Sequence, residues 1–506
     1  MCSIIIIYSV SEMSLCSRGP FVFSLLQRPL PQSQGLYFST HSVHFRNIAE
    51  IFHADKRPDV HLDLQAGEEL LNIPRKPPVI KPCPKWTQSI KKTLDGPMSE
   101  QRDHLHEYCE AGFALQKHLK HRKPPLEGKE LVAREKKVEQ KLAKEFGVNN
   151  LEDETEVPAS KVKSRTKALR KQYIWQWAPI EFDKTAALTY LVTRSAGEFA
   201  SLKHIFREVK TNMPQYQPRT LFDFGSGLTT GLWAFKDTFG DLTEAFCVDP
   251  SKQMNDLARL IMGQGADKAD LPAGISFRLH NPSQVGIQYD LVLSSHSLME
   301  LPSAADRLTA VHSLWRRVED GGVLVLVELG TNAGYQLVVE ARDYLLQLAQ
   351  LSRVGEAEQS LEGHVLAPCP HDQPCPRYLS DNVPCNFSVR YNNFDLKGLD
   401  PTVVRHETFS YVVFKKGARE TEAYPRVVEE VIKTKGNIYC RLCTSEGGLQ
   451  EVLCRKKVDS KLYQLAKRLS PGQQLPATLV KTEKKEKEPW TPWSQRKPSE
   501  GQGMNG

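Results

Sequence analysis

Long apolar runs are missing from this sequence of 506 residues. A helix needs about 20 consecutive apolar residues to cross a bilayer. The most apolar stretches near the N-terminus are Ile4 to Tyr8, which is short, and Phe21 to Leu26, which Ser24 interrupts. The sequence therefore predicts no membrane-spanning segment and no membrane partner.

Cysteine is scarce as well. The chain holds 11 cysteines, a far lower density than in secreted domains that depend on disulfide bonds. Six of them fall between Cys369 and Cys454, and such clustering favours a metal site over scattered disulfide bonds. A chain of this length exceeds what one core usually serves, so we expect two or more folding units.

Acidic residues are nearly missing from the first 49 residues, where Glu12 stands alone among arginines and serines. This composition is typical of a mitochondrial presequence. A start at Met13 would remove both Glu12 and the isoleucine-rich opening and would match a presequence better, which suggests an upstream extension or an alternative start. A secretory signal is the alternative, but no positive region precedes the apolar stretch and no disulfide framework follows. We predict a presequence over residues 1–45 and a location in the mitochondrial matrix.

Acids are missing again from Lys161 to Lys171, which holds six basic residues. With a formal net charge of +7 for the chain, this basic run favours a polyanion such as RNA as a partner. The alternative explanation is that the run is only the solvent-exposed face of a helix. Apolar spacing predicts helices over Leu126 to Phe146 and over Ala159 to Trp177. Aromatic residues end the second helix. They could contact RNA, or they could anchor the helix in a hydrophobic core, and we favour the anchoring role for the tryptophans.

The two ends of the chain look unlike the middle. Prolines over residues 50–95 break any helix and predict an extended segment that wraps rather than packs. Together with the two helices it makes a basic, partly helical N-terminal arm over residues 46–180. Residues 466–506 are rich in lysine, glutamate, proline and glycine, and predict a disordered tail.

From about residue 181 the pattern alternates between helix and strand. We expect helices over 184–210, 229–239, 251–262 and 303–317, and strands over 220–224, 244–248, 289–294 and 322–328. Such alternation predicts an α/β fold with a parallel, doubly wound sheet, a Rossmann-like domain over residues 181–355. A strand over 409–414 and a hairpin around 438–454 are expected to complete this sheet.

A glycine loop follows the first of these strands, in the stretch Asp223-Phe-Gly225-Ser226-Gly227. Glycine lets the backbone turn tightly and approach a ligand without a Cβ in the way. Asp249 ends the next strand, where a carboxylate suits the two hydroxyls of a ribose. The loop lacks the G-x-G-x-x-G spacing that seats a pyrophosphate, so S-adenosylmethionine is favoured over a dinucleotide, with an empty pocket as the alternative.

A second candidate site is a set of cysteines. Cys369, Cys375 and Cys385 are spaced C-x5-C-x9-C in a proline-rich loop, and Cys443 follows after 57 residues. Four thiolates can hold an iron–sulfur cluster or structural zinc, and this spacing matches neither compact zinc ribbons nor the ferredoxin run. The sequence therefore predicts a metal centre and leaves the metal open.

Other residues compete for this site. Cys440 and Cys454 are alternatives for the fourth ligand, and His364 and His371 are candidate substitute ligands, although a loop histidine more often faces solvent. Unpaired structural cysteines are the alternative to a metal centre.

Five stretches carry a family resemblance: Asp-Phe-Gly-Ser-Gly (223–227), Ser-Leu-Met-Glu-Leu-Pro-Ser (297–303), Leu-Val-Glu-Leu-Gly-Thr-Asn-Ala-Gly (326–334), Ala-Pro-Cys-Pro-His-Asp-Gln-Pro-Cys-Pro (367–376) and Arg-Leu-Cys-Thr-Ser-Glu-Gly (441–447). They resemble the mitochondrial methyltransferase-like protein 17 family. The resemblance covers roughly residues 160–465 and leaves out the N-terminal arm and the tail.

The resemblance implies a factor that assembles the mitochondrial small ribosomal subunit and contacts its rRNA, ribosomal proteins and other assembly factors. It also implies a methyltransferase fold that binds S-adenosylmethionine. Residues 356–465 would then be an iron–sulfur extension that completes the sheet. In it, a 4Fe-4S cluster is held by Cys369, Cys375, Cys385 and Cys443.

A set of catalytic residues is not evident. Amino methyltransferases usually carry Asn/Asp-Pro-Pro-aromatic after the fourth strand, where this sequence has Ser294-Ser-His-Ser-Leu-Met. A cytosine C5 methyltransferase needs a nucleophilic cysteine there, and none occurs between Cys247 and Cys369. His296 and Glu300 are candidates for acid–base work, but a helix cap and a solvent contact explain them more simply.

We therefore predict a binding protein in which methyl transfer is lost. The alternative is an active rRNA methyltransferase that presents His296 and Glu300 to a flipped base.

Overall fold

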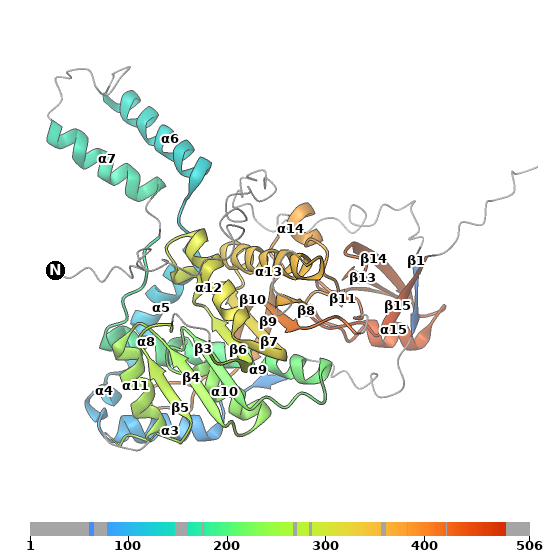
Figure 1. Cartoon of the computed structure of the whole chain (residues 1–506), viewed down its shortest axis with the longest axis horizontal. Coiled ribbons are helices and arrows are strands. Elements are labelled where there is room, and N and C mark those ends of the chain that lie inside the picture. Colours follow the sequence, from blue (N-terminus) through green and yellow to red (C-terminus); the bar gives the residue numbers. More distant parts are fainter. Residues whose placement is uncertain are drawn as a thin grey trace, which may run out of the picture. The chain divides into compact units, whose positions relative to one another are not determined.

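The computed structural model of the chain describes residues 60–64, 78–146, 159–174, 177–266, 271–282, 286–355, 361–381, 383–420 and 423–481 (Figure 1). All of them belong to one compact unit, residues 47–506. The predicted presequence, Trp175 and residues 482–506 of the predicted tail lie outside these ranges. Within them, every helix is too short or too polar to span a bilayer.

A nine-stranded sheet forms the centre of the fold, with the order β2-β9-β10-β7-β6-β3-β4-β5 and with β8 also paired to β10. Five neighbouring strands are parallel, namely β3 (Thr220–Phe224), β4 (Glu244–Val248), β5 (Ile275–Arg278), β6 (Tyr289–Ser295) and β7 (Val318–Leu329). Beside β7, β10 (Arg405–Lys416) runs antiparallel, so the sheet is mixed rather than parallel throughout. The fold is α/β and Rossmann-like, as predicted, except that the sheet is mixed instead of parallel.

Helices cover both faces of the sheet (Figure 1). Leu291 and Leu293 of β6 share one core with α9 (Ser195–Asn212), α10 (Thr230–Phe239) and α11 (Lys252–Met262). Val292, between them, joins the opposite core with α12 (Ala304–Arg316) and α13 (Asn332–Arg353). The strand therefore buries successive side chains on opposite faces, and both faces are apolar. The helix predicted over 184–210 is two helices, because α8 (Lys184–Thr193) ends at Arg194 before α9 begins.

The proline-rich segment packs into the core, which corrects the prediction of a wrapping strand. Here β2 (Val79–Ile80) pairs with β9, and α3 (Pro84–Asp95) buries Trp86 completely. Pro84 stands in the first turn of α3, where its missing N–H costs nothing, so this proline starts a helix instead of breaking one. Two further helices, α4 (Ser99–Asp103) and α5 (Leu105–His121), were not predicted.

The two basic helices are present as α6 (Gly128–Phe146) and α7 (Ala159–Tyr173), which lie side by side and are called the helical hairpin below (Figure 1). They pack around a small core of their own, made of Val138, Leu142, Leu169 and Ile174. Two ion pairs join the helices, Arg165 to Glu145 at 2.8 Å and Arg170 to Glu135 at 3.2 Å.

One strand position of the large sheet is split. β8 (Gly363–Ala367) pairs with the second half of β10, and β9 (Phe387–Tyr391) pairs with its first half on the same edge. Both run antiparallel to β10, so they follow each other along one line. Residues 368–386, with the short helix α14 (Pro376–Ser380), are thus an insertion within one strand position.

The predicted hairpin around 438–454 exists, but it does not complete the large sheet. It lies in a separate four-stranded sheet of β11 (Arg426–Val427), β12 (Ile432–Thr434), β13 (Asn437–Cys443) and β14 (Leu449–Arg455). This sheet has its own apolar core with α15 (Ser460–Ala466), whereas β8 and β9 already occupy the edge of β10. The disordered tail predicted from residue 466 also starts too early. Residues Ala477–Lys481 form β15, which pairs with β1 (Val60–Leu64).

Candidate cofactor sites

The glycine loop lies at the carboxyl end of β3. The amides of Gly225 and Ser226 both donate to the carbonyl of Val248, at 2.8 and 2.9 Å, and so tie the loop to the end of β4. Gly225 has a φ of +71°, and a Cβ there would lie 1.9 Å from Oγ of Ser297. The position therefore admits glycine alone, both by its backbone angle and by the space around it.

Both predicted acids are at this loop. Asp223 is 2 % exposed, and its Oδ2 has no partner within the described ranges. Burial, helped by Asp249 and Glu198, raises the pKa of Asp223 to about 8. The carboxylate of Asp249 accepts from the amides of Gly227 at 2.9 Å and Ser251 at 2.8 Å, and burial raises its pKa to about 6.

More buried polar atoms without partners surround the loop. Within the described ranges these are Oγ of Ser226, Oγ of Ser294, Oγ of Ser295 and both ring nitrogens of His296. They lie in the glycine loop and at the carboxyl end of the adjacent strand β6. Buried polar groups are nearly always hydrogen-bonded, so this concentration indicates a site shaped for a polar ligand. The residues present therefore fit a polar ligand such as S-adenosylmethionine.

Neither His296 nor Glu300 is placed to act as an acid or a base. Burial, together with Arg194, lowers the pKa of His296 to about 3, so its ring stays neutral. Glu300, in the short helix η3 (Leu298–Glu300), accepts a bidentate pair of hydrogen bonds from Arg122 and a third bond, of 3.0 Å, from the amide of Ile180. The carboxylate of Glu300 is therefore engaged in structural hydrogen bonds and is not free to act as a base.

These contacts form a clasp where the chain enters and leaves the helical hairpin. Arg122, just before the hairpin, also donates to the carbonyl of Ala178, just after it, at 2.8 Å. Nε1 of Trp177 donates to the carbonyl of Met299 at 2.6 Å. Both connecting segments of the hairpin are therefore fixed to η3, which directly follows Ser297, the residue beside Gly225. Trp177 acts as an anchor, as we favoured from the sequence.

The raised pKa of Asp223 predicts a pH-dependent stability for the ligand-free protein. An unfolded aspartate has a pKa near 3.8 and the folded one about 8, so the folded state binds more protons between these values and stability falls as pH rises from about 4 to about 8. Asp223→Asn removes this contribution. We expect the melting temperatures at pH 5 and pH 8 to differ less in the variant than in the wild type; an unchanged difference contradicts the assignment.

The four predicted cysteine ligands meet between α13, the insertion and β13. The pKa of the Cys443 thiol is raised by burial and then by Cys369, Cys385 and Cys375, and the pKa of Cys385 is raised by burial, Cys375 and Cys369. Such mutual effects require neighbouring thiols. The hydroxyl oxygen of Tyr335, in α13, lies 3.2 Å from Sγ of Cys375.

The thiols are neighbours but are not drawn together around one point. Within the described ranges, no group of three or more histidine, cysteine, aspartate or glutamate side chains is arranged to hold a metal ion. A single zinc ion needs four sulfurs, each about 2.3 Å from it. A four-iron cluster binds each thiolate through a different iron, and so it needs them farther apart.

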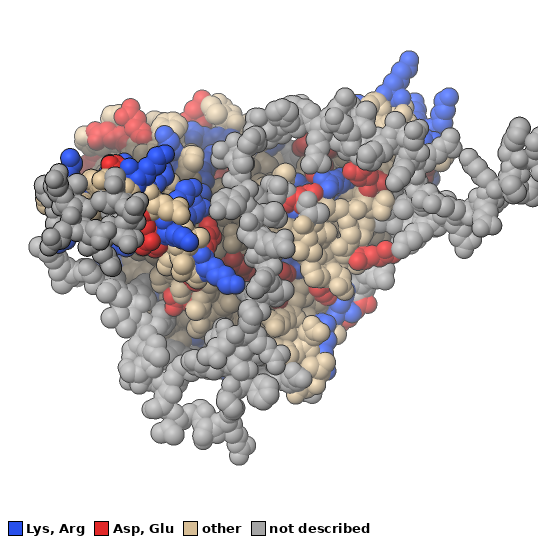
Figure 2. All heavy atoms as spheres, turned by 90° about the horizontal axis from the view of Figure 1, so that it is seen from above, with Lys and Arg blue, Asp and Glu red and all other residues tan. Residues whose placement is uncertain are grey.

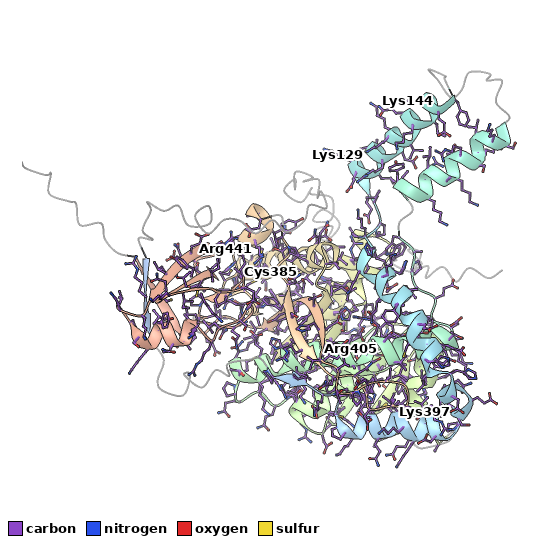
Figure 3. All side chains as sticks on the ribbon, turned by 180° about the vertical axis from the view of Figure 1, so that it is seen from behind. Lys129, Lys144, Cys385, Lys397, Arg405 and Arg441 are labelled. Carbon is purple, nitrogen blue, oxygen red and sulfur yellow. The ribbon has the colours of Figure 1, made fainter. Side chains whose placement is uncertain are left out.

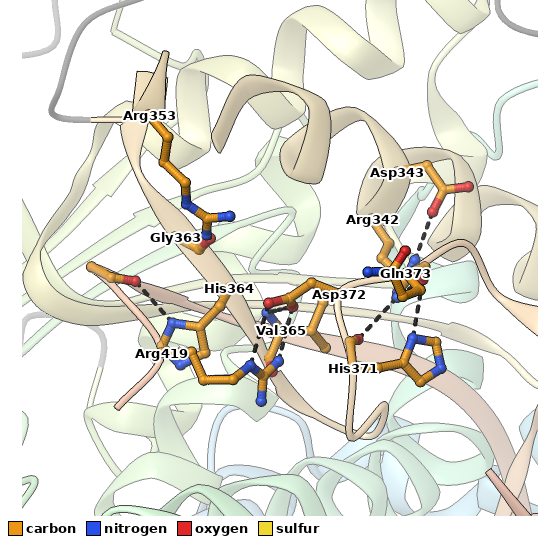
Figure 4. Close-up of polar contacts among 11 residues, drawn as sticks. Arg342, Asp343, Arg353, Gly363, His364, Val365, His371, Asp372, Gln373 and Arg419 are labelled. Atoms are coloured by element: carbon orange, nitrogen blue, oxygen red, sulfur yellow. Dashed lines mark hydrogen bonds and ion pairs between the residues drawn. The ribbon is translucent and has the colours of Figure 1, made fainter. Parts of the chain in front are cut away.

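Three buried arginines surround this cysteine cluster. Arg342 of α13 donates to the carbonyls of His371 at 3.1 Å and Gln373 at 2.6 Å, and so holds the insertion (Figure 4). Arg342 and Arg426 each act to lower the pKa of Cys369, and Arg377 does the same for Cys385, although burial dominates in both cases. Each of these arginines is also paired with a carboxylate, Arg342 with Asp343 at 2.7 Å, Arg377 with Glu429 at 3.6 Å and Arg426 with Glu208. The three arginines, in α13, α14 and β11, were not predicted from the sequence, because an isolated arginine usually lies at the surface.

The strand geometry separates the two competing cysteines of β13. Side chains alternate along β13, so Cys440 faces the apolar core of the small sheet together with Cys454, and Cys443 faces the other three thiols. His364 contacts the carbonyl of Gly417, at 2.8 Å, instead of a thiol. His371 does reach the cluster, with Nε2 at 3.3 Å from Sγ of Cys443.

Comparison with known proteins identifies the family. Residues 184–476 match the model of the family described as mitochondrial small ribosomal subunit Rsm22. The human protein "Ribosome assembly protein METTL17, mitochondrial" is 33 % identical over 370 residues, which are 72 % of this chain and 76 % of that protein. The protein "Ribosome assembly protein RSM22, mitochondrial" of Saccharomyces cerevisiae is 19 % identical and covers 56 % of this chain and 65 % of its own length.

Among solved structures, a SAM-dependent methyltransferase from Aquifex aeolicus aligns with a TM-score of 0.28 and 11 % identity, over 47 % of this chain and all of that one. A similarity this low adds nothing to the topology described above. The sequence relatives confirm the family resemblance, and their names agree with the predicted mitochondrial location. The chain belongs to the Rsm22 family of mitochondrial small ribosomal subunit proteins.

Proposed function

We propose that this protein assists assembly of the mitochondrial small ribosomal subunit by binding its immature rRNA. Its relatives in human and yeast are named as ribosome assembly proteins. Ribosomal proteins and other assembly factors would be its further partners. The observation that carries the RNA contact is a row of exposed lysines on the helical hairpin.

The row lies on α7. Lys163, Lys167 and Lys171 are exposed and four residues apart, so they lie on one face of the helix. The arginines of the same helix, Arg165 and Arg170, are used in ion pairs that join the hairpin. Figure 2 shows basic and acidic side chains interspersed over one face of the molecule, so a local row is a better candidate than a general positive field. Lysines in such a row neutralise successive phosphates of RNA.

Replacement of Lys163, Lys167 and Lys171 by glutamine tests the contact. We expect weaker binding to rRNA fragments and a salt dependence whose logarithmic slope falls by about 2, since each lost phosphate contact accounts for about 0.7. Fluorescence anisotropy of labelled RNA at several salt concentrations measures both. Lys129 and Lys144, at the two ends of α6, provide a matched pair of substitutions on the other helix (Figure 3). An unchanged slope in the triple variant refutes the contact.

We also propose that the glycine loop binds S-adenosylmethionine, through Asp223, Gly225, Ser226, Gly227 and Asp249. The unpartnered polar atoms around the loop support this. When bound, S-adenosylmethionine would supply a transferable methyl group, although the residues beside it favour binding without transfer. Glu300 is engaged by Arg122, and the ring of His296 is buried and neutral.

Gly225→Ala tests this site. The added methyl collides with Ser297 and the loop loses its positive φ, so we expect no measurable binding of S-adenosylmethionine by calorimetry. Gly240→Ala is the matched control: it has a φ of +96° but open space around the position, and so it carries the backbone strain without the collision. Equal loss of binding in both variants would show that strain alone is responsible.

An active rRNA methyltransferase is the second candidate function. The unpartnered hydroxyls of Ser294 and Ser295, at the carboxyl end of β6 beside the glycine loop, favour it. Transfer of a labelled methyl group to rRNA, lost in Asp223→Ala, would establish this function.

Finally, we propose that Cys369, Cys375, Cys385 and Cys443 hold a 4Fe-4S cluster. The mutual proximity of the four thiols supports a shared metal centre, and the family resemblance favours the cluster over zinc. The bound cluster would supply a cross-link between the insertion and the small sheet. The chain's own part is to bring the thiols together from β13 and the insertion, with Arg342 fixing the loop between them.

A further inference from the structure

One face of α13 borders the cysteine cluster. Tyr335, Val339 and Arg342 lie on this face, because Val339 is four and Arg342 seven residues after Tyr335. All three residues are buried, and Tyr335 and Val339 share a small apolar core with Cys375. The helix therefore forms a wall of the candidate metal centre, although none of these three residues is among its proposed ligands.

The hydroxyl of Tyr335 contacts one of the proposed ligands directly. Its oxygen lies 3.2 Å from Sγ of Cys375, which is within the range of a hydrogen bond to sulfur. Burial, and then Cys375, Cys385 and Cys369, raise the pKa of Tyr335, so the hydroxyl also lies near two further thiols. A single O–H group thus faces three of the four cysteines.

The direction of the hydrogen bond between Tyr335 and Cys375 depends on the state of the cysteine. While Cys375 is a free thiol, either group can donate, since both the S–H and the O–H carry a proton. A cysteine that binds a metal is deprotonated, so its sulfur can only accept. Once Cys375 is a ligand, the hydroxyl of Tyr335 is therefore the donor, and it points at a negatively charged sulfur.

A donor at a ligating sulfur changes the reduction potential of an iron–sulfur cluster. Reduction adds one negative charge to the cluster and its thiolates, so a hydrogen bond to a sulfur stabilises the reduced form more than the oxidised form. Such an effect is stronger away from water, and Tyr335 is only 7 % exposed. The position of its hydroxyl is therefore suited to raising the potential.

A packing role is the alternative explanation for Tyr335. Its ring meets the ring of Tyr378 edge to face, with 6.0 Å between the centroids, and so it contributes to the small apolar core by its ring alone. Phenylalanine keeps this ring and lacks only the hydroxyl. Tyr335→Phe therefore separates the hydrogen bond from the packing.

We propose that Tyr335 donates a hydrogen bond to the ligating sulfur of Cys375 and thereby raises the reduction potential of the cluster. The proposal rests on the proposed 4Fe-4S cluster. It adds a residue outside the four ligands and gives it an electrostatic role instead of ligation. No proton is transferred: the hydroxyl keeps its proton in both oxidation states, and the cluster takes up one electron.

Tyr335→Phe is expected to lower the reduction potential. Loss of one hydrogen bond to a charged sulfur should make the equilibrium constant for reduction about tenfold less favourable, which corresponds to about 59 mV for one electron. The potential is measured on the full chain, purified anaerobically, by titration with dithionite followed by electron paramagnetic resonance. Iron content, sulfide content and melting temperature are measured on the same samples.

Tyr344→Phe is the matched control. Tyr344 belongs to the same helix, and its hydroxyl contacts Nδ1 of His312, at 3.1 Å, instead of a thiol. This variant also loses one tyrosine hydroxyl and one hydrogen bond, so any general effect of such a loss on α13 appears in it as well. We expect its reduction potential to equal that of the wild type.

The outcomes separate this inference from the proposal on which it rests. Wild-type protein without iron and sulfide refutes the cluster, and the role of Tyr335 with it. If the wild type holds the cluster and Tyr335→Phe has the same potential, then Tyr335 only packs against the site and the cluster proposal stands. If Tyr335→Phe loses the cluster while Tyr344→Phe retains it, then the hydroxyl is needed to hold the cluster, which contradicts a role in its potential alone.

Discussion

Cys375→Ala and Cys443→Ala are expected to yield protein without iron and sulfide that no longer associates with the small ribosomal subunit. The four thiols come from the insertion and from β13, so the proposed cluster would join the insertion to a sheet that otherwise has a separate core. Structural metal sites contribute on the order of 10 kcal/mol to folding of the segment that they hold. Loss of one ligand should therefore release the insertion and the surface that it forms.

Cys440→Ala is the matched control for this prediction. Cys440 lies on the same strand as Cys443 but faces the apolar core of the small sheet. Truncating it should cost only about 1 to 2 kcal/mol through the cavity that it leaves, with iron retained. Metal and sulfide analysis of anaerobically purified protein, together with co-sedimentation with the small subunit, measures the difference. Zinc without sulfide in the wild type, or normal association of iron-free Cys375→Ala, would refute the proposal.

Glu300→Ala is expected to destabilise the protein by about 3 kcal/mol, because it leaves the guanidinium of Arg122 buried without its carboxylate. The side chain of Arg122 is 1 % exposed and that of Glu300 is 29 % exposed, so we take the lower end of the range for a broken buried pair. The clasp also fixes both ends of the helical hairpin. We therefore expect proteases to cut the connections of the hairpin faster in this variant.

Glu130→Ala provides the comparison, since it removes an exposed ion pair with Arg134 within α6, which is worth about 0.5 kcal/mol at most. Chemical denaturation and limited proteolysis report the two effects separately. A Glu300→Ala protein as stable and as resistant as Glu130→Ala would show that the clasp does not hold the hairpin.

The core of the fold could be predicted from the sequence because its signals are local. Strands such as Thr220–Phe224 and Glu244–Val248 are short, mostly apolar runs with an acid at or just after their ends, and their bounds were predicted correctly. β5 was missed because Ile275–Arg278 is only four residues long and partly exposed. The helix start at Pro84 was missed because proline was taken as a breaker, whereas its effect depends on its position in the helix.

The candidate sites were predictable to a smaller extent. The glycine loop is contiguous, so its residues could be named from the sequence alone. The choice of Cys443 over Cys440 depends on which face of β13 turns toward the insertion, and this is decided by packing. The role of Glu300 depends on Arg122, which is far away in the chain and meets it only in the folded protein.

The split strand position has a consequence for the origin of the cysteine-bearing loop. Ala367 pairs with Val413 and Phe387 with Phe409, so the two ends of the loop are separated by the length of three residues of β10. A bridge of about three residues, at about 3.3 Å each, would therefore close the gap and leave one unbroken strand. A loop that carries three cysteines can thus be added to this sheet, or removed from it, without changing the order or direction of any strand.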